Sequence, residues 1–181
     1  MINRQVALIR GINVGRAKRV SMADLRALVE SLGYRNVCTL LNSGNVVFTV
    51  PGASRTLAAP RIEKAMAATL HVSARVMVLT AAELASAVTE NPLLAIATDP
   101  SRLLVTVFSK PADRARLEPL ALQNWAPDVL ALGRRVAYLW CPGGMLDSRL
   151  ATAASRVLGD AATARNWATM MKLDALVKSS A

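Results

Sequence analysis

The order in which hydrophobic periodicity changes along this chain is the strongest constraint on its fold. Alternating apolar residues, typical of strands, give way to the three-to-four-residue spacing of amphipathic helices and then return. In chain order we expect a strand at residues 5–10, a helix at 21–32, strands at 36–41 and 45–50, a helix ending near 70, and a strand at 74–79. This succession of strand, helix, strand, strand, helix and strand is the ferredoxin-like βαββαβ order.

The same succession starts again in the second half of the chain. We expect a strand at 102–109, a short helix at 111–119, a hairpin at 128–140, a helix at 146–158, a weak strand at 161–164 and a final helix after 166. The sequence therefore predicts an α+β fold of two ferredoxin-like lobes with antiparallel sheets. The expected division is a first lobe over 1–80, a connecting helix and linker over 81–100, and a second lobe with the C-terminal helix over 101–181.

Three polar residues mark predicted helix starts. Ser21 is followed three residues later by an aspartate, and Thr80 is followed at the same spacing by Glu83, which is a full capping box. Asn166 is a natural N-cap for the last helix, and Trp167 at its first position is expected in the core. These signals fix where helices begin more firmly than periodicity alone does.

The charge of the chain is strongly basic, with a formal net charge of +10 over 181 residues, and 17 of its 22 basic residues are arginine. Arginine suits carboxylates and phosphates, so an anionic small molecule is one expected partner. The alternative is a merely compositional excess spread over solvated faces. Nucleic acid is possible but less favoured, because basic residues cluster only near residue 16 and aromatic residues are scarce.

Several classes of protein are disfavoured by composition. Cys38 and Cys141 are too few for a disulfide framework and lack metal-ligand spacing, so we expect neither a metal nor a cofactor. No apolar run is long enough for a membrane span, and the expected location is the cytoplasm. RNA recognition by stacking on the first and third strands would have only Phe48 to use. The oligomeric state is left open.

Two glycine-bearing loops are expected to meet at one edge of the first sheet. In the ferredoxin-like order the first and third strands are antiparallel neighbours, so residues 10–15 should lie beside 42–45. Such a meeting would present backbone N–H groups with polar and basic side chains, which suits an anion. The expected binding residues there are Arg10, Gly11, Asn13, Gly15, Ser43, Gly44 and Asn45. Plain turns, with Asn13 bonding local backbone, are the alternative.

Other candidate residues are weaker. Arg165 precedes the start of a helix, where a cation is explained by a carboxylate or a bound anion, so Arg165 and Asn166 join the expected binding set. A nucleophilic Ser43 would need a base, and the one histidine, His71, is expected at the opposite edge of the sheet. Catalytic residues therefore stay unassigned, and whether the protein is an enzyme is open.

Three stretches of the chain are distinctive as a set: ALIRGINVG at 7–15, LNSGNVVF at 41–48 and TARNWATMMKL at 163–173. Together they resemble one bacterial family, the domain of unknown function 1697. The resemblance implies an α+β fold of two ferredoxin-like lobes and no established activity. The chain departs from the family pattern at Arg16, Asn42 and Ala168, and at Arg149, where the family tends to have lysine. An arginine there keeps the positive charge but cannot act through a free amine.

The residues support more than one class of function. The first hypothesis is a module that binds an anion or nucleotide, with Arg10 and Arg165 supplying charge and Asn13, Ser43 and Asn45 supplying orientation. The second is an enzyme acting on a small polar or phosphorylated substrate through Asn, Ser and Arg side chains. A nucleic-acid-associated protein or an interaction protein with an exposed sheet face or edge is the third.

Overall fold

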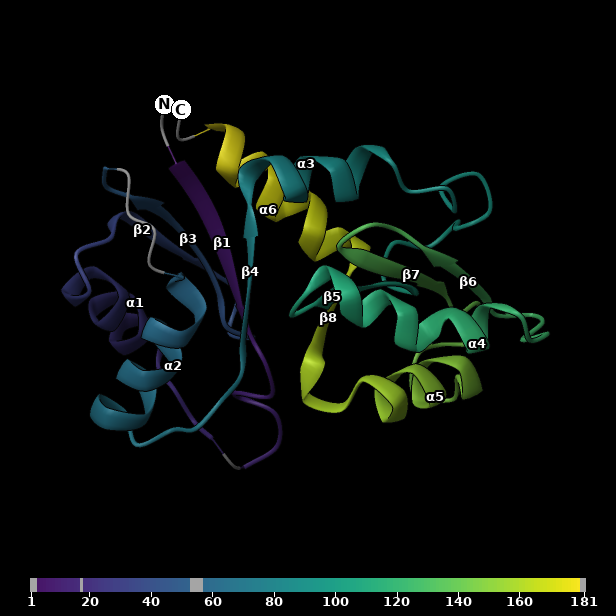
Figure 1. Cartoon of the computed structure of the whole chain (residues 1–181), viewed down its shortest axis with the longest axis horizontal. Helices are drawn as coiled ribbons and strands as arrows, with labels where there is room; N and C mark the ends of the chain where they lie inside the picture. The colour runs from purple at the N-terminus through teal and green to yellow at the C-terminus, as the bar shows by residue number, and fades with distance from the viewer. Residues whose placement is uncertain (1–2, 17, 53–56, 180–181) are drawn as a thin grey trace. The chain divides into compact units, whose positions relative to one another are not determined.

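The computed structural model describes residues 3–16, 18–52 and 57–179, so the predicted lobe ends at residues 1 and 181 lie outside the described residues. The chain divides into two compact units, Met1–Leu84 with Ala175–Ala181, and Ala85–Asp174 (Figure 1). The division runs through two helices, α3 (Ala81–Thr89) and α6 (Trp167–Ser179). Each unit is therefore described by itself.

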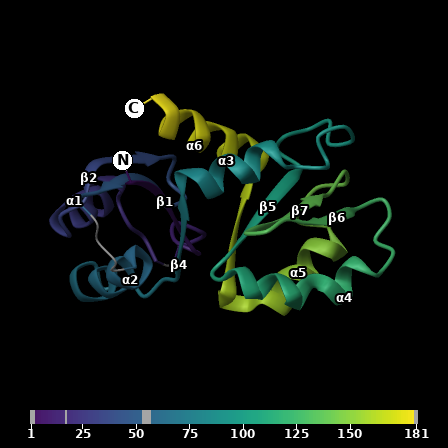
Figure 2. The same cartoon turned by 45° about the horizontal axis from the view of Figure 1, so that its top comes forward.

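The first unit contains one four-stranded antiparallel sheet with strand order β2-β3-β1-β4. Two helices, α1 and α2, belong to this unit (Figure 2). Its elements are β1 (Asn3–Ile9), α1 (Met22–Ser31), β2 (Arg35–Leu40), β3 (Asn45–Val50), α2 (Ala58–Thr69) and β4 (Val76–Thr80). This is the ferredoxin-like arrangement that the sequence predicts.

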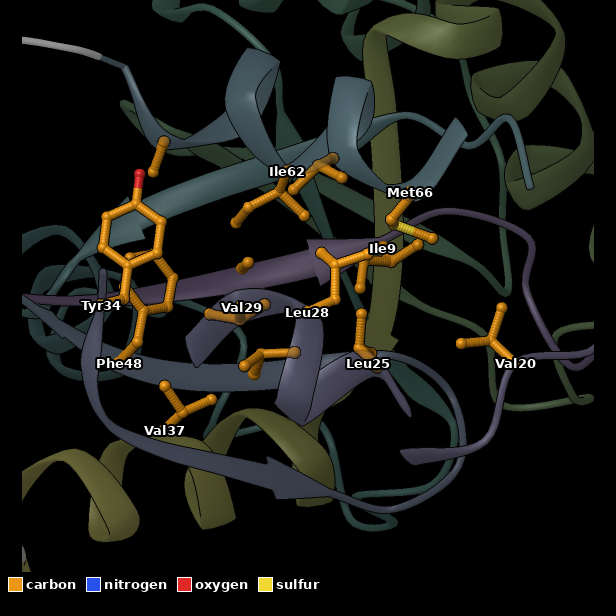
Figure 3. Close-up of a cluster of buried hydrophobic side chains, with 14 of the residues drawn as sticks. Ile9, Val20, Leu25, Leu28, Val29, Tyr34, Val37, Phe48, Ile62 and Met66 are labelled. Carbon is orange, nitrogen blue, oxygen red and sulfur yellow. The ribbon is translucent and has the colours of Figure 1, made fainter. Parts of the chain in front are cut away.

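The core of the first unit lies between its sheet and the apolar stripes of α1 and α2 (Figure 3). Leu25 and Leu28 of α1 face Ile62 and Met66 of α2 across this core, at the three- and four-residue spacings of amphipathic helices. Complete burial of such a side chain contributes about 1.5–3 kcal/mol. The aromatic pair of the core is Tyr34 and Phe48, with ring centroids 4.7 Å apart.

Among the described residues of the first unit, one charged residue is buried. Arg4 of β1 is 7% exposed, and its guanidinium donates a hydrogen bond of 2.5 Å to the carbonyl of Val177, in the last turn of α6. A cation at a helix C-terminus compensates the partial negative charge of the last carbonyls. This bond ties the end of α6 to the first unit.

The second unit repeats the topology, with strand order β6-β7-β5-β8 in a second antiparallel sheet. Its strands are β5 (Leu103–Phe108), β6 (Val129–Leu132), β7 (Val136–Trp140) and β8 (Ala162–Asn166). Its other elements are the 3-10 helices η1 (Pro111–Leu117) and η2 (Gly159–Ala161) and the helices α4 (Glu118–Ala121) and α5 (Arg149–Leu158). The prediction of an α+β fold with two antiparallel ferredoxin-like sheets is confirmed.

Local capping explains most helix starts. The Ser21 hydroxyl accepts the N–H of Asp24, and Thr80 and Glu83 form the predicted reciprocal box. The predicted start of a helix at residue 146 is wrong. The helix α5 begins at Arg149, because the Ser148 hydroxyl accepts the N–H of Ala151 and so caps the helix at that point.

Candidate functional site

The end of β1 and the start of β3 lie side by side, as the topology predicts. Leu8 pairs with Asn45 in the antiparallel register, and the N–H of Ile9 donates to the carbonyl of Gly44 at 2.8 Å. The Asn13 amide then crosses to the other loop, where its Nδ2 donates to the Asn42 carbonyl at 2.7 Å. The structure therefore brings the loop at 10–15 and the turn at 42–45 together.

Asn13 closes the loop that follows β1. Its Oδ1 accepts the N–H of Val20 at 2.9 Å, and its Nδ2 donates to the Val20 carbonyl at 2.8 Å. Its own N–H donates to the Lys18 carbonyl at 3.1 Å. Asn13 has a φ of 56°, a left-handed conformation that asparagine tolerates better than most residues. Its side chain therefore clamps the base of this loop, and we call its described residues 13–16 and 18–20 the basic loop.

The tip of the basic loop presents cations to solvent. Arg16, Lys18 and Arg19 are exposed, and within the described part of the chain none of them has a carboxylate within 4.0 Å. Arg26 of α1, by contrast, pairs with Glu30 at 3.0 Å. The basic loop thus gathers positive charge that its own surroundings do not neutralise.

Gly44 permits the close approach of the two loops. A Cβ placed on it would lie 2.7 Å from Cδ1 of Ile12 and 2.9 Å from Cβ of Ile9, and its φ is +79°. Both facts require glycine. Gly11 and Gly15 also have positive φ, but they face open space, so there only the backbone conformation favours glycine.

Asn45 and Ser43 in the turn, and the backbone of Arg10 at the end of β1, make hydrogen bonds within the fold. Asn45 is fully buried, and its Nδ2 donates to the Leu40 carbonyl and to the Ser43 hydroxyl, both at 2.9 Å. Arg10 is partly buried at the end of β1, and its N–H donates to the Arg75 carbonyl at 2.8 Å. Ser43 and Asn45 therefore shape the turn beside the basic loop.

Arg165 and Asn166 belong to the second unit and form a separate group. Arg165 of β8 is 9% exposed, and its Nη1 donates to the Thr163 hydroxyl at 3.1 Å and the Ala164 carbonyl at 2.9 Å. Burial lowers the pKa of Arg165 to about 10. Asn166 caps α6, because its Oδ1 accepts from both the N–H and the hydroxyl of Thr169 at 2.9 and 2.8 Å.

A hollow in the second unit brings together residues that sequence reasoning did not assign to a site, although it singled out Arg149 as a departure from the family pattern. Its lining includes Trp125, Asp128, Ser148 and Arg149. The available signal was modest: a Gly-Gly turn after a strand, followed by a serine that caps a helix. Trp125 and Asp128 lie in an irregular segment between α4 and β6, where no periodicity marks a position as buried or exposed.

The structure gives little support for a cysteine nucleophile or a metal site in its described part. Cys141 is fully buried, and burial raises the pKa of its thiol, which disfavours the nucleophilic thiolate. Among the described residues no group of three His, Cys, Asp or Glu side chains is placed to hold a metal ion.

No helix in the described part of the chain is long and apolar enough to cross a membrane.

The fold and the two polar regions define a protein of two ferredoxin-like units with a basic loop in the first and a hollow in the second. The chain belongs to the family described as "Protein of unknown function (DUF1697)", whose model matches residues 2–138. The stretch at 163–173, one of the three that carry the sequence resemblance, lies beyond those matched residues.

A solved structure shares the fold. It is that of a conserved bacterial protein, SP0830 from Streptococcus pneumoniae, with a TM-score of 0.78 and 22% sequence identity. The match covers 96% of this chain and 98% of that one, so the fold likeness extends over both units. No curated protein matches the chain.

Proposed function

We propose that this protein binds a phosphate-bearing small molecule through the basic loop. The observation that carries the proposal is the Asn13 clamp, which closes the base of the loop and leaves Arg16, Lys18 and Arg19 exposed at its tip. Like charges gathered on one loop repel one another, and two unit charges 4 Å apart in water would do so by about 1 kcal/mol. A bound anion would relieve that repulsion.

The chemistry of the loop suits phosphate. The planar guanidinium groups of Arg16 and Arg19 can each donate two parallel hydrogen bonds to phosphate oxygens, and Lys18 supplies a compact charge. Gly11, Asn13 and Gly15 have positive φ, whereas the residues between them do not. Alternation of φ along the chain is typical of the backbone concavities that bind anions. Arg10 extends the positive surface to the end of β1.

The proposed contacts differ from the full set that the sequence suggests. Asn13, Ser43, Gly44 and Asn45 build the base of the site, and their polar or small side chains serve the loop. Arg165 and Asn166 are buried or committed to a helix cap in the second unit, so the proposal gives them no contact with the ligand.

A nucleic acid is a poorer candidate ligand. β1 contains no aromatic residue and β3 contains Phe48, which is fully buried and packs against Tyr34. Sheet surfaces that read single-stranded RNA stack bases on exposed aromatic rings at such positions. The basic loop can therefore hold a phosphate, but the first sheet lacks the stacking surface that would hold a base.

The test compares two triple variants with the same loss of charge. In the first, Arg16, Lys18 and Arg19 are replaced by alanine; in the control, the exposed residues Arg35, Lys64 and Arg134 are replaced instead. Wild type and control should be stabilised by inorganic phosphate, pyrophosphate or a nucleotide in thermal-shift and calorimetric titrations, by about 2.7 kcal/mol at 100 times the dissociation constant. The loop variant should lose that stabilisation.

Other outcomes would contradict the proposal. An equal loss in both triple variants would show that net charge, and not the basic loop, attracts the anion. No binding of any of these anions by the wild type would remove the function altogether. Submicromolar binding of an oligonucleotide at ~150 mM salt, with a steep salt dependence, would replace the small molecule with nucleic acid.

A further inference from the structure

A hollow of about 200 Å³ lies wholly within the second unit, and the proposed anion site does not use it. Its walls are the segment 124–128, the turn at Gly143 and Gly144, and residues 147–149 at the start of α5. An adjoining hollow of about 330 Å³ continues along α5 as far as Arg156. A single water needs only about 10–15 Å³, so there is room for a small molecule.

The carboxylate of Asp128 is held in place within this wall. Ser148 is 4% exposed, and its hydroxyl donates to Oδ2 of Asp128 at 2.7 Å while accepting the N–H of Ala151 at 2.9 Å. The N–H of Asp128 in turn donates to the Trp125 carbonyl at 2.9 Å. A carboxylate fixed in this way loses little freedom when it accepts a hydrogen bond from a ligand.

The Trp125 ring is also fixed but not enclosed. Its indole Nε1 donates to the Leu120 carbonyl at 2.7 Å, and the residue is partly buried and lines both hollows. The indole N–H is therefore already used, and what remains for a ligand is the apolar ring, which also attracts cations.

Opposite charges line the hollow without neutralising each other. Asp128, Asp147 and Arg149 line the smaller hollow, and Arg149 and Arg156 line the larger one. In the described part of the second unit, the ion pairs join other residues. A ligand with one charge would satisfy one side of the hollow and leave the other charge partly desolvated, which is unfavourable.

We propose that this hollow binds a small zwitterion of the α-amino acid class. The ammonium group donates hydrogen bonds to the Asp128 carboxylate and lies against the Trp125 ring, and the carboxylate group accepts from the Arg149 guanidinium. Both charges of the ligand then meet their opposites in one hollow. The aliphatic or aromatic part of the ligand packs on the indole.

The first test uses wild-type protein and matched ligands. Phenylalanine is compared with phenethylamine, which lacks the carboxylate, with 3-phenylpropionate, which lacks the ammonium group, and with glucose, which is neutral. Glycine and alanine test whether the aromatic part matters. Calorimetric titration should show phenylalanine binding roughly tenfold or more tightly than either half-molecule, because each lacks one charge-assisted hydrogen bond.

The second test uses variants of the hollow. Asp128→Asn keeps an oxygen that can accept from Ser148, and Arg149→Gln changes an exposed side chain, so both should fold. Each should weaken binding of the amino acid roughly tenfold. Glu90→Gln and Arg134→Gln are the controls, because each removes one exposed charge of the same sign outside the hollow and should leave the affinity unchanged.

Four results would overturn the proposal. Two concern affinity: equal binding of phenylalanine and its half-molecules, and retained affinity in both Asp128→Asn and Arg149→Gln. The other two are binding of glucose without binding of any amino acid, and absence of amino-acid binding at millimolar concentration. None of these depends on the basic loop, so the phosphate proposal can fail or hold independently.

Discussion

The two units share a strand order but extend different connections. In the first unit the chain between β1 and α1 runs through residues 10–21 and carries the basic loop. In the second unit the equivalent connection between β5 and η1 is only residues 109–110. There the long connections are instead 122–128 before β6 and 141–148 before α5, and these line the hollow.

This difference shows where variation is tolerated in such a fold. The four-stranded sheets are constrained by pairing and burial, so both units keep the same order. Connections lie at the surface, tolerate changes of length and sequence, and carry functional groups on a rigid scaffold. The helical layers differ too: Pro111 and Pro119 coincide with a 3-10 helix and a single turn of α-helix where the first unit has the longer α1.

The largest expected effect concerns the packing of the second unit, which contains all three tryptophans of the chain. Trp167 is 6% exposed at the first position of α6, and truncating a buried tryptophan typically costs about 3–5 kcal/mol. Trp167→Ala should lower the melting temperature sharply in circular dichroism. Trp125→Ala, at a partly buried ring, should lower it less. Equal melts for both variants would contradict this ranking.

The next effect tests whether Arg10, which precedes the basic loop of the first unit, contributes to anion binding. Arg10→Ala should leave the melting temperature of the unliganded protein nearly unchanged, because the backbone bond from residue 10 to Arg75 survives the substitution and a side-chain ion pair near the surface contributes only about 0–1 kcal/mol. Stabilisation by phosphate or nucleotides, about 2.7 kcal/mol for wild type at 100 times the dissociation constant, should be reduced. Arg26→Ala on α1 is the control. If Arg10→Ala unfolds the protein, Arg10 is a structural residue.

A pair of glycines contrasts the turn between β2 and β3 in the first unit with the turn after β7 in the second. Gly44→Ala forces a Cβ against Ile12 and Ile9 at positive φ and should cost about 1–3 kcal/mol. Gly143→Ala, in the wall of the hollow, meets no atom within 4 Å and has no positive φ, so its effect should stay within about 0.5 kcal/mol. Urea unfolding of both variants measures the difference, and similar values would show that the two turns are equally tight.

The smallest effect concerns a buried phenol in the second unit. Tyr138 donates to the Ala87 carbonyl at 2.8 Å, and burial, with a smaller contribution from Glu90, raises the pKa of Tyr138 to about 12. Its unfolded pKa is 10.0, so the folded state holds the proton longer. The stabilisation is complete below pH 10 and is lost as the pH rises toward 12.

Tyr138→Phe isolates this contribution. The variant should be about 1 kcal/mol less stable than wild type at neutral pH, because the Ala87 carbonyl loses its donor. The gap between the two proteins should narrow above pH 10. Arg165 also titrates in this range. Because burial lowers its pKa to about 10, it makes stability rise with pH above pH 10. This contribution is the same in both proteins and cancels in the difference. A gap that does not change with pH would contradict the assignment.

Much of the fold could be predicted because its signals are local. Strand and helix periods, the Ser21 and Asn166 caps and the Thr80–Glu83 box each depend on residues a few positions apart. The start of α5 was missed because periodicity extends into the preceding turn, and only the Ser148 bond to Ala151 shows where the helix begins. Topology then predicted that loops 10–15 and 42–45 would meet.

Sequence by itself determined the α+β class, the repeated strand order, the meeting of the two glycine-bearing loops and the basic character of one of them. Tertiary structure decided which of the polar side chains stay exposed and which serve the fold. Asn13 and Asn45 became parts of the scaffold, Arg165 became buried, and Asp128 met Ser148 across twenty residues of sequence. The physical reason is that periods and caps act between neighbours along the chain, whereas burial and hydrogen-bond partners depend on which distant segments pack together.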